Sequence, residues 1–187
     1  METHMLWTPL QQAGLEHLHL IENETGASAD GLVLGIERAI PFRLHYQIRM
    51  DSTWHVRECH LQAEKSLHLY ADGQGHWTDD TGTALPELDG CLDIDISRTP
   101  FTNTLPIRRL GLAAGEQAKI LVVYITAPDL SIRPFPQRYT CLTRTDTDAI
   151  YRYESLEGTF TADLPVNSQG LVIDYPKGWK RVEIPVA

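Results

Sequence analysis

DGCLDIDISRTPFTNTLPIRRL, residues 89–110, is the stretch that decides the fold, because it joins a strand pattern to the best helix pattern in the chain. Its first half alternates strictly, with Ile94 and Ile96 on one face and Asp93 and Asp95 on the other. A period of two is typical of a half-buried β-strand whose carboxylates lie opposite its aliphatic side chains. We therefore expect a strand here, followed directly by a helix.

The helix pattern begins at Thr99, which can accept a hydrogen bond at a helix N-terminus. Pro100 suits the first helical position because no backbone N–H is required there. Gly111 can end the helix in the left-handed conformation. Pro106 lies inside the pattern and removes a backbone hydrogen bond, so we expect the helix over residues 99–110 to be either kinked or broken into two short turns.

The rest of the chain reads mostly as strands. The segment containing Pro128, Pro134 and Pro136 is expected to be a loop or an irregular edge. No linker is long enough to divide the chain, so we expect one domain over residues 1–187, all-β and mainly antiparallel, packed around a single helix. Alternation predicts further strands over residues 15–22, 31–37, 42–50, 54–61, 66–71, 75–78, 119–126, 138–144, 150–155, 159–164, 171–175 and 179–186.

The charge balance excludes some classes of partner. The chain has 187 residues, and its 16 basic and 25 acidic residues give a net charge of −9. Such a surface repels phosphate backbones, so we do not expect nucleic-acid binding. It also repels anionic lipid headgroups, which argues against docking on a bare membrane but not against binding one extracted lipid.

The lack of a secretory signal pattern and the spacing of the cysteines favour a cytoplasmic protein. The first ten residues, METHMLWTPL, lack the pattern of a secretory signal, and the longest apolar run, residues 120–125, is too short to span a membrane. Cys59, Cys91 and Cys141 form no close pair. They fit small buried residues in a reducing compartment better than a disulfide framework or a zinc motif.

His17 and His19 are two residues apart in a predicted strand, so both imidazoles leave the same face. This geometry suits two metal ligands. A site needs a third ligand, and nothing in the sequence brings His45, His60 or His68 near. We interpret the pair as a solvated polar face and predict no metal and no cofactor.

Asp93 and Asp95 allow several interpretations. Two carboxylates on one strand face could act as the acid/base pair of a glycosidase, bind a cation or accept hydrogen bonds from sugar hydroxyls. They could also form a charged outer face, or pair with Arg98, Arg108 or Arg109.

Arg108 and Arg109 lie near the predicted C-terminus of the helix, where cations suit the helix dipole. If the helix is buried, at least one of them must pair inside the fold, and Asp93 or Asp95 is the natural partner. An anionic ligand headgroup is the alternative.

The second half of the chain is rich in aromatic residues with polar tips. Their faces suit stacking on sugar rings and equally suit ordinary pairing within a sheet. No nucleophile elbow, phosphate loop, dinucleotide-binding glycine pattern or metalloprotease motif is present, which weighs against an enzyme. The aromatic residues concerned are Tyr139, Tyr151, Tyr153, Tyr175 and Trp179.

Taken together, seven segments resemble one known family, the bacterial putative glycolipid-binding proteins, catalogued as a domain of unknown function. The resemblance implies a spiral β-roll, in which a long antiparallel sheet wraps around one helix, and possible assembly as a homodimer. It implies a glycolipid-binding role but no catalytic residues. The segments are DGQGHW (72–77), LPELDGCLDIDI (85–96), TPFTNTLPIRRL (99–110), YITAPDL (124–130), QRYT (137–140), YRYES (151–155) and GLVIDYP (170–176).

We accordingly predict non-catalytic binding of a glycolipid or another amphipathic molecule. One alternative is a hydrolase acting on a glycan or lipid headgroup with Asp93 and Asp95 as its acid/base pair. Another is a structural protein that dimerises through its sheet edges. The candidate ligand-binding residues are Asp93, Asp95, Asn103, Arg108, Arg109, Tyr139 and Tyr153.

Overall fold

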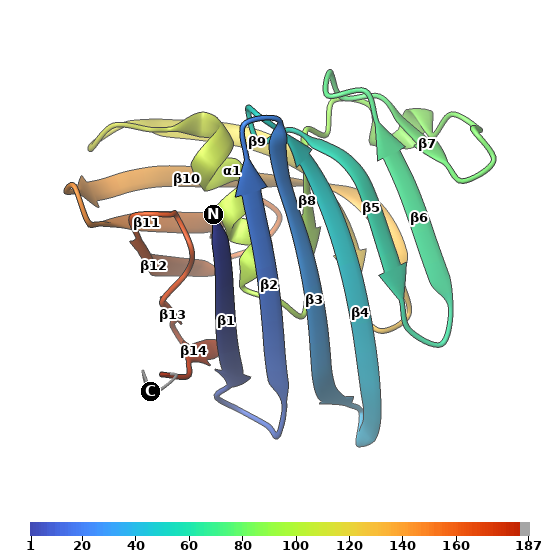
Figure 1. Ribbon diagram of the computed structural model, residues 1–187, viewed down its shortest axis with the longest axis horizontal. Coiled ribbons are helices and arrows are strands. Elements are labelled where there is room, and N and C mark those ends of the chain that lie inside the picture. Colours follow the sequence, from blue (N-terminus) through green and yellow to red (C-terminus); the bar gives the residue numbers. More distant parts are fainter. Residues whose placement is uncertain (184–187) are drawn as a thin grey trace.

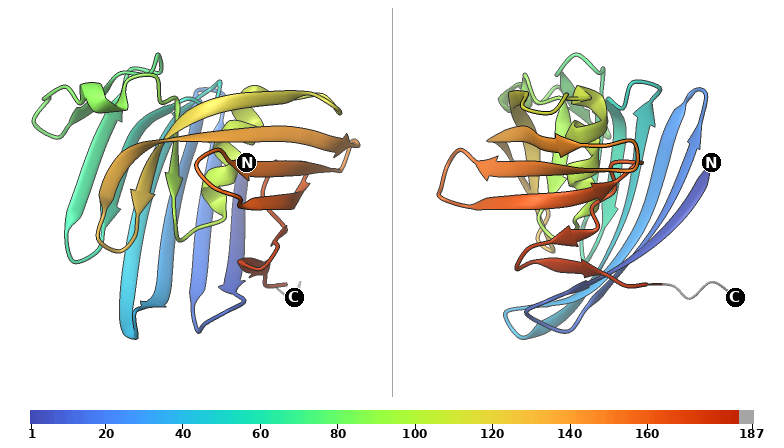
Figure 2. Two further views of the ribbon diagram at one scale, coloured as in Figure 1. Left: turned by 180° about the vertical axis from the view of Figure 1, so that it is seen from behind. Right: turned by 90° about the vertical axis from the view of Figure 1, so that its left-hand side faces the viewer.

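A computed structural model describes residues 1–183 of the chain, and within them alternating segments form two sheets around one short α-helix (Figures 1 and 2). The nine-stranded sheet has the order β13-β14-β1-β2-β3-β4-β5-β6-β7, and all its pairs are antiparallel. It curls around the helix. Its strands are β1 (Glu2–Pro9), β2 (Leu15–Asn23), β3 (Gly26–Glu37), β4 (Ile40–Asp51), β5 (Val56–Gln62), β6 (Ser66–Ala71), β7 (Trp77–Asp79), β13 (Asp174–Tyr175) and β14 (Trp179–Arg181).

The five-stranded sheet has the order β12-β11-β10-β9-β8 and crosses behind the first sheet (Figure 1). Its β8–β9 pair is parallel, whereas its other pairs are antiparallel. A parallel pair requires a crossover connection, and the helical segment between β8 and β9 supplies it. The strands are β8 (Asp93–Ile96), β9 (Gln117–Thr126), β10 (Ser131–Arg144), β11 (Asp148–Ser155) and β12 (Thr161–Asn167).

The helical segment changes from a 3-10 turn to an α-helix ahead of Pro106, and it is not broken at Pro106 itself. A 3-10 turn, η2 (Phe101–Asn103), leads into α1 (Thr104–Leu110). Pro106 therefore lies in the first turn of α1, where a missing N–H leaves no intrahelical bond unmade. The predicted ends are confirmed, because Thr99 Oγ1 accepts the Phe101 N–H at 2.9 Å and Gly111 is left-handed at φ 56°.

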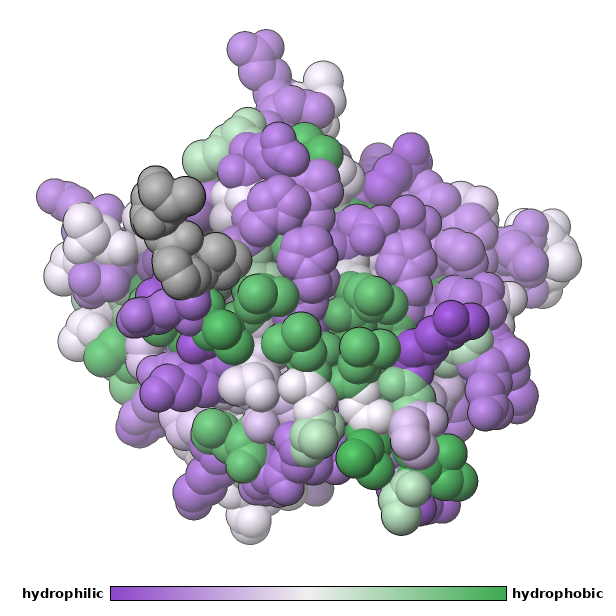
Figure 3. All heavy atoms as spheres, turned by 60° about the horizontal axis from the view of Figure 1, so that its bottom comes forward, coloured by the Kyte–Doolittle hydropathy of each residue, from purple (hydrophilic) through white to green (hydrophobic). Residues whose placement is uncertain are grey.

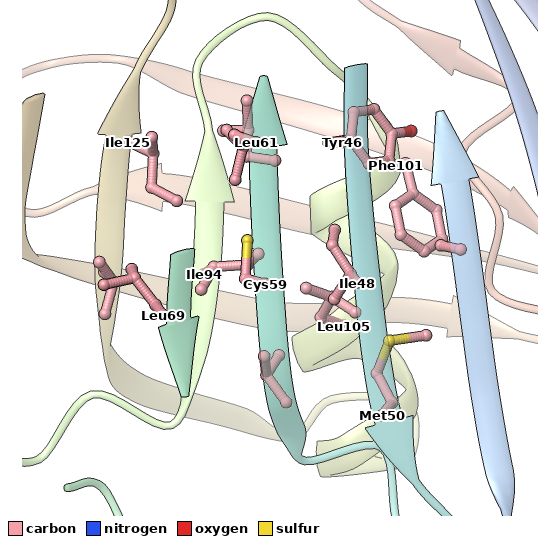
Figure 4. Packing of buried hydrophobic residues seen from close by; sticks show 14 of the residues in the cluster. Tyr46, Ile48, Met50, Cys59, Leu61, Leu69, Ile94, Phe101, Leu105 and Ile125 are labelled. Atoms are coloured by element: carbon pink, nitrogen blue, oxygen red, sulfur yellow. The ribbon is translucent and has the colours of Figure 1, made fainter. Parts of the chain in front are cut away.

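The helical segment lies between the two sheets and contacts both (Figure 2). Phe101 and Leu105 point toward the strands of the nine-stranded sheet, where they pack near Tyr46 and Ile48 (Figure 4). Ile107 belongs to a second cluster built on the five-stranded sheet. The helix thus joins two cores, which confirms the expected roll.

Three expectations for individual strands need correction. Strand β1 is an additional strand that the sequence patterns do not predict. The segment around Pro134 and Pro136 is a regular half of β10, not a loop. It pairs only with β9, since pairing with β11 begins at Gln137, so both prolines lie where no second ladder needs their N–H. The last strand ends at Arg181, and the final part of the predicted range 179–186 lies outside the described residues.

The outer face of the nine-stranded sheet divides into two zones. Figure 3 shows a band of hydrophobic side chains across this face and hydrophilic side chains beyond it. Leu15, Leu32 and Leu34 are exposed there, and Leu15 pairs directly with Leu34.

A separate short 3-10 turn, η1 (Pro86–Leu88), precedes β8. No helix among residues 1–183 has the length and apolar character needed to cross a membrane.

Candidate functional site

A groove of about 550 Å³ lies between the five-stranded sheet and the short strands β13 and β14. We call it the aromatic groove. Six aromatic side chains line it, together with carboxylate, amide and cationic groups. Its lining residues are Pro9, Gln11, Gln12, Asp95, Ile96, Ser97, Arg98, Thr99, Asn103, Tyr124, Arg133, Phe135, Tyr153, Ser155, Phe160, Tyr175, Lys177, Gly178 and Trp179.

Asp95 is the carboxylate of the aromatic groove. Strand alternation turns it away from Ile94 and Ile96, which are buried in the core. Its side chain accepts hydrogen bonds from Gln137 Nε2 at 2.6 Å and from Thr102 Oγ1 at 3.2 Å. Burial raises the pKa of Asp95, and these two hydrogen bonds oppose the rise. Asp95 is therefore a positioned acceptor with no cationic partner among these contacts.

Asn103 lies beside Asp95 and is held rigidly by its neighbours. Its Nδ2 donates to the carbonyl oxygen of Pro100 at 3.0 Å, and its Oδ1 accepts from the hydroxyl of Tyr139 at 2.8 Å. Tyr139 is buried and does not line the groove. It supports the site from below, because it holds the amide of Asn103 in one orientation.

The aromatic side chains form two groups in the groove. Tyr153 lies 5.9 Å from Phe160 between ring centroids, and Phe160 stacks on Tyr175 at 6.2 Å. Tyr124 and Phe135 lie 5.2 Å apart in the other group. Burial raises the pKa of the Tyr153 and Tyr175 hydroxyls, so both remain neutral donors and acceptors near pH 7. Tyr139 and Tyr153 pair directly across β10 and β11.

A second hollow, of about 640 Å³, lies at the end of the roll where three hairpin turns meet. We call it the end pocket. Apolar side chains from these turns form part of it, and charged residues surround them. Its lining residues are Glu37, Arg38, Ile40, Pro41, Phe42, Arg43, Ala63, Glu64, Lys65, Thr126, Ala127, Pro128 and Asp129.

The aromatic groove and the end pocket adjoin each other. Arg98 lines the groove, Glu37 lines the end pocket, and the two side chains form an ion pair. Beside this pair, Ser97 of the groove accepts a hydrogen bond at 3.0 Å from the backbone N–H of Ala127, which lines the end pocket. A polar, aromatic hollow and a partly apolar one are therefore separated by a single layer of side chains.

The other predicted ligand residues have structural partners. Arg109 donates to both carboxylate oxygens of Asp93, at distances of 2.6 to 3.2 Å, and Asp93 is fully buried. Arg108 pairs with Glu22 at 2.9 Å and covers the ring of Trp54 at 4.2 Å. None of Asp93, Arg108 and Arg109 lines the aromatic groove. Arg109 pairs with one of the two expected aspartates, whereas the partner of Arg108 is Glu22 and neither of them.

The two-carboxylate arrangement required by the hydrolase alternative is not formed. Asp95 lines the groove, whereas Asp93 is enclosed by the sheet and by Arg109. An acid/base pair needs both carboxyl groups beside the same scissile bond. The two residues share a strand face but not their surroundings, because Arg109 of α1 covers only Asp93.

Several groove residues have no clear signal in the sequence. Phe135 lies between two prolines, and the other missed residues, Arg98, Arg133 and Phe160, lie at the ends of strands or in turns. Asp95 and Asn103 were predicted individually, whereas for the aromatic residues the signal was the aromatic enrichment of the second half. Of the aromatic residues it singled out, Tyr153, Tyr175 and Trp179 line the groove.

Comparison with known proteins places the chain in a family. The family model described as Putative glycolipid-binding matches residues 4–181. A crystal structure of a DUF1089 family protein from Pseudomonas aeruginosa is similar, with a TM-score of 0.81, 44% sequence identity, and 92% of this chain and 96% of that chain covered. No curated protein matches. The chain therefore belongs to the Putative glycolipid-binding family.

Proposed function

We propose that the protein binds one glycolipid, or a molecule of the same amphipathic design, without catalysis. The observation that carries this proposal is the adjacency of the aromatic groove and the end pocket across the Arg98–Glu37 ion pair. A polar headgroup joined to an alkyl chain has the same two-part character. The interior between the sheets, by contrast, is occupied by α1 and the core, so the proposed binding site is at the surface.

The groove suits a sugar headgroup. Sugar rings present apolar C–H faces that pack on aromatic rings, and the exposed Phe160 and half-buried Tyr175 offer such faces. Sugar hydroxyls need acceptors, and Asp95 provides one that its two neighbours already orient. Positioned polar groups in an otherwise aromatic site are how small-molecule sites obtain specificity.

The end pocket suits the alkyl part. Ile40 is 65% exposed and Phe42 lies beside it, so an alkyl chain here would cover surface that is now in water. Burial of each methylene contributes about 0.8 kcal/mol. Lengthening the chain by two methylenes should therefore tighten binding by roughly tenfold until the pocket is full.

Titration calorimetry with octyl, decyl and dodecyl glucosides below their micelle concentrations tests this proposal. We expect one site per chain, affinity that rises with chain length, and weaker binding by Tyr153→Ala and Ile40→Asp. The matched control is Tyr70→Ala, which removes an exposed aromatic residue that lines neither hollow. Affinity independent of chain length, or an equal loss in the control, would contradict the two-part site.

The natural ligand can be identified by native mass spectrometry of protein purified from its own host. A retained glycolipid would give a defined mass shift, which the Ile40→Asp variant should lose. The same spectra report whether the chain forms a homodimer.

A further inference from the structure

A cluster of three histidines and a glutamate lies on the outer face of the nine-stranded sheet. Glu2 and His4 come from β1, and His17 and His19 come from β2. His4 pairs directly with His19 in the antiparallel register, so their outward side chains are cross-strand neighbours. Of the His17–His19 pair only His19 belongs to the group of possible ligands, and the other two members come from β1, the strand that the sequence patterns do not predict.

Three of these side chains bring ligand atoms close to one another. His19 Nε2 lies 2.7 Å from Glu2 Oε1, and His4 Nε2 lies 3.6 Å from the same oxygen. One ligand atom from each of the three residues lies within 4.8 Å of the other two. Zinc bonds to nitrogen and oxygen of about 2.0–2.2 Å in a tetrahedral site place neighbouring ligand atoms roughly 3.3 Å apart. Because the separations run from 2.7 Å to at most 4.8 Å, the exposed side chains would have to move by roughly 0.5 to 1.5 Å to reach that geometry.

The imidazole rings lie close together, but one of them must turn before both can bind one ion. The rings of His4 and His19 are stacked, with centroids 4.4 Å apart and planes 5° from parallel. Because each lone pair lies in its ring plane, rotation of one exposed ring about its side-chain bonds is needed to direct both nitrogens at the same point. His17 Nε2 lies 3.1 Å from His4 Nδ1. When His4 Nδ1 carries the proton and donates to His17, the Nε2 lone pair of His4 is left free for a metal. Metal-ligating histidines usually have such a partner on their second nitrogen.

From this geometry we infer that Glu2, His4 and His19 bind a divalent transition metal of the zinc type, with His17 as the positioning residue of His4. Two neutral imidazoles and one carboxylate form a set that zinc prefers, and the fourth position is open to water. Among residues 1–183 this is the one group in which three side chains can offer ligand atoms together. None of the four residues lines the aromatic groove or the end pocket, so the inference is independent of glycolipid binding.

The ligands come from two neighbouring strands, which gives the metal a structural effect. The ion would connect β1 to β2, whose backbone hydrogen bonds already fix the register between the two strands. A metal that binds the folded chain and not the unfolded chain raises stability by mass action. The melting temperature should therefore rise with zinc concentration.

The test uses untagged, chelator-treated protein and ZnCl2 as the probe. We expect calorimetry to show one zinc per chain, with binding lost in His4→Ala and His19→Ala. His17→Ala should retain one zinc but weaken it by about tenfold to hundredfold. The matched control is His45→Ala, which removes a histidine on the same face that bonds Asp30 at 3.0 Å without a second histidine.

Circular dichroism without metal confirms that each variant is folded, and thermal melts provide a second readout. Zinc should raise the melting temperature of wild type and of His45→Ala, whereas it should not raise that of His4→Ala or His19→Ala. Absence of saturable zinc binding by folded wild type would overturn the site. Equal losses in His45→Ala and His19→Ala would also overturn it, because binding would then be a general property of histidines on this face.

Discussion

The hydroxyl of Tyr46 donates a hydrogen bond of 2.5 Å to the carboxyl group of Glu16, and both side chains are fully buried. Thr99, which also caps the turn before α1, donates to the same oxygen at 2.5 Å. One buried acid thus ties strands β2 and β4 to the start of the helical segment. Burial raises the pKa of Glu16 from its ordinary value of 4.5 to about 8, and the two hydrogen bonds only partly oppose this rise.

Glu16 should make the protein less stable as the pH rises. Between pH 4.5 and 8 the folded chain keeps the Glu16 proton that the unfolded chain loses. The stability contribution is therefore complete below pH 4.5 and lost as the pH passes through 8, by up to about 5 kcal/mol at roughly 1.4 kcal/mol per pKa unit. Glu16→Gln should remove this slope, as measured by urea unfolding at pH 5, 7 and 9. Equal slopes in wild type and variant would contradict the raised pKa, and the exposed Glu24→Gln variant is the control.

Gly31 makes room for Tyr46. A Cβ added at Gly31 would lie 1.9 Å from the Tyr46 ring, and that ring is fully buried and bonded to Glu16. Gly31→Ala should therefore lower the free energy of unfolding by about 1–3 kcal/mol or more, because the ring must move. Chemical denaturation measures the loss. Gly158→Ala is the control, since its added Cβ would meet only Ser155 Oγ at 3.7 Å. A similarly small loss of unfolding free energy in both variants would show that the Tyr46 ring can move aside at little cost.

The Asp93–Arg109 pair should be important for folding and not for ligand binding. Arg109→Leu leaves a fully buried carboxyl group without its partner, which typically costs about 3–5 kcal/mol of stability. The double variant Asp93→Leu with Arg109→Leu should recover most of this loss, because no buried charge remains. Thermal and urea unfolding measure both variants.

An exposed pair provides the comparison for Asp93–Arg109. Arg152 and Asp163 bond at 2.8 Å, but both side chains are 44% exposed. Arg152→Ala should change stability by about 1 kcal/mol or less. If Arg109→Leu also lowers stability by only about 1 kcal/mol or less, water must reach the Asp93 carboxyl group despite its burial.

Substitution of Asp95 should weaken ligand binding more than it lowers stability, which is the opposite of what we expect for the Asp93–Arg109 pair. Asp95→Asn replaces one carboxylate acceptor by an N–H donor, and we expect decyl glucoside binding to weaken by about 1–3 kcal/mol, the usual penalty for an unmade buried hydrogen bond. Because burial raises the pKa of Asp95, wild-type affinity should fall on acidification at a higher pH than for an ordinary aspartate. Calorimetry across pH 4 to 7 should show this fall in wild type and not in Asp95→Asn. Identical pH profiles would place Asp95 outside the binding site.

Much of the roll could be predicted because its signals are local. The alternation of Ile94 and Ile96 with two aspartates marked strand β8, and Thr99 and Gly111 marked the ends of the helical segment. These signals depend on backbone conformation and on side-chain direction within a few residues, which neighbouring residues specify directly.

The N-terminal strand shows where local signals fail. Met5 and Trp7 are buried and His4 faces out, but Leu6 between them is also apolar and interrupts the alternation that would indicate a strand. Glu16 lies on the inward face of β2 together with Leu18, and both are fully buried. What satisfies that acid, Tyr46 and Thr99, comes from segments 30 and 83 residues away.

By itself the sequence determined that the chain is a β-rich roll around one short helical segment, and which face of each well-patterned strand is apolar. Only the tertiary structure decided what those faces contact. Asp93 and Asp95 have the same residue type and lie on the same strand face, yet α1 places Arg109 over one and leaves the other at an aromatic groove. The physical reason is that strand alternation sets the direction of a side chain, whereas sheet pairing and the crossover of the helix set its neighbours, and those contacts are long-range in the chain.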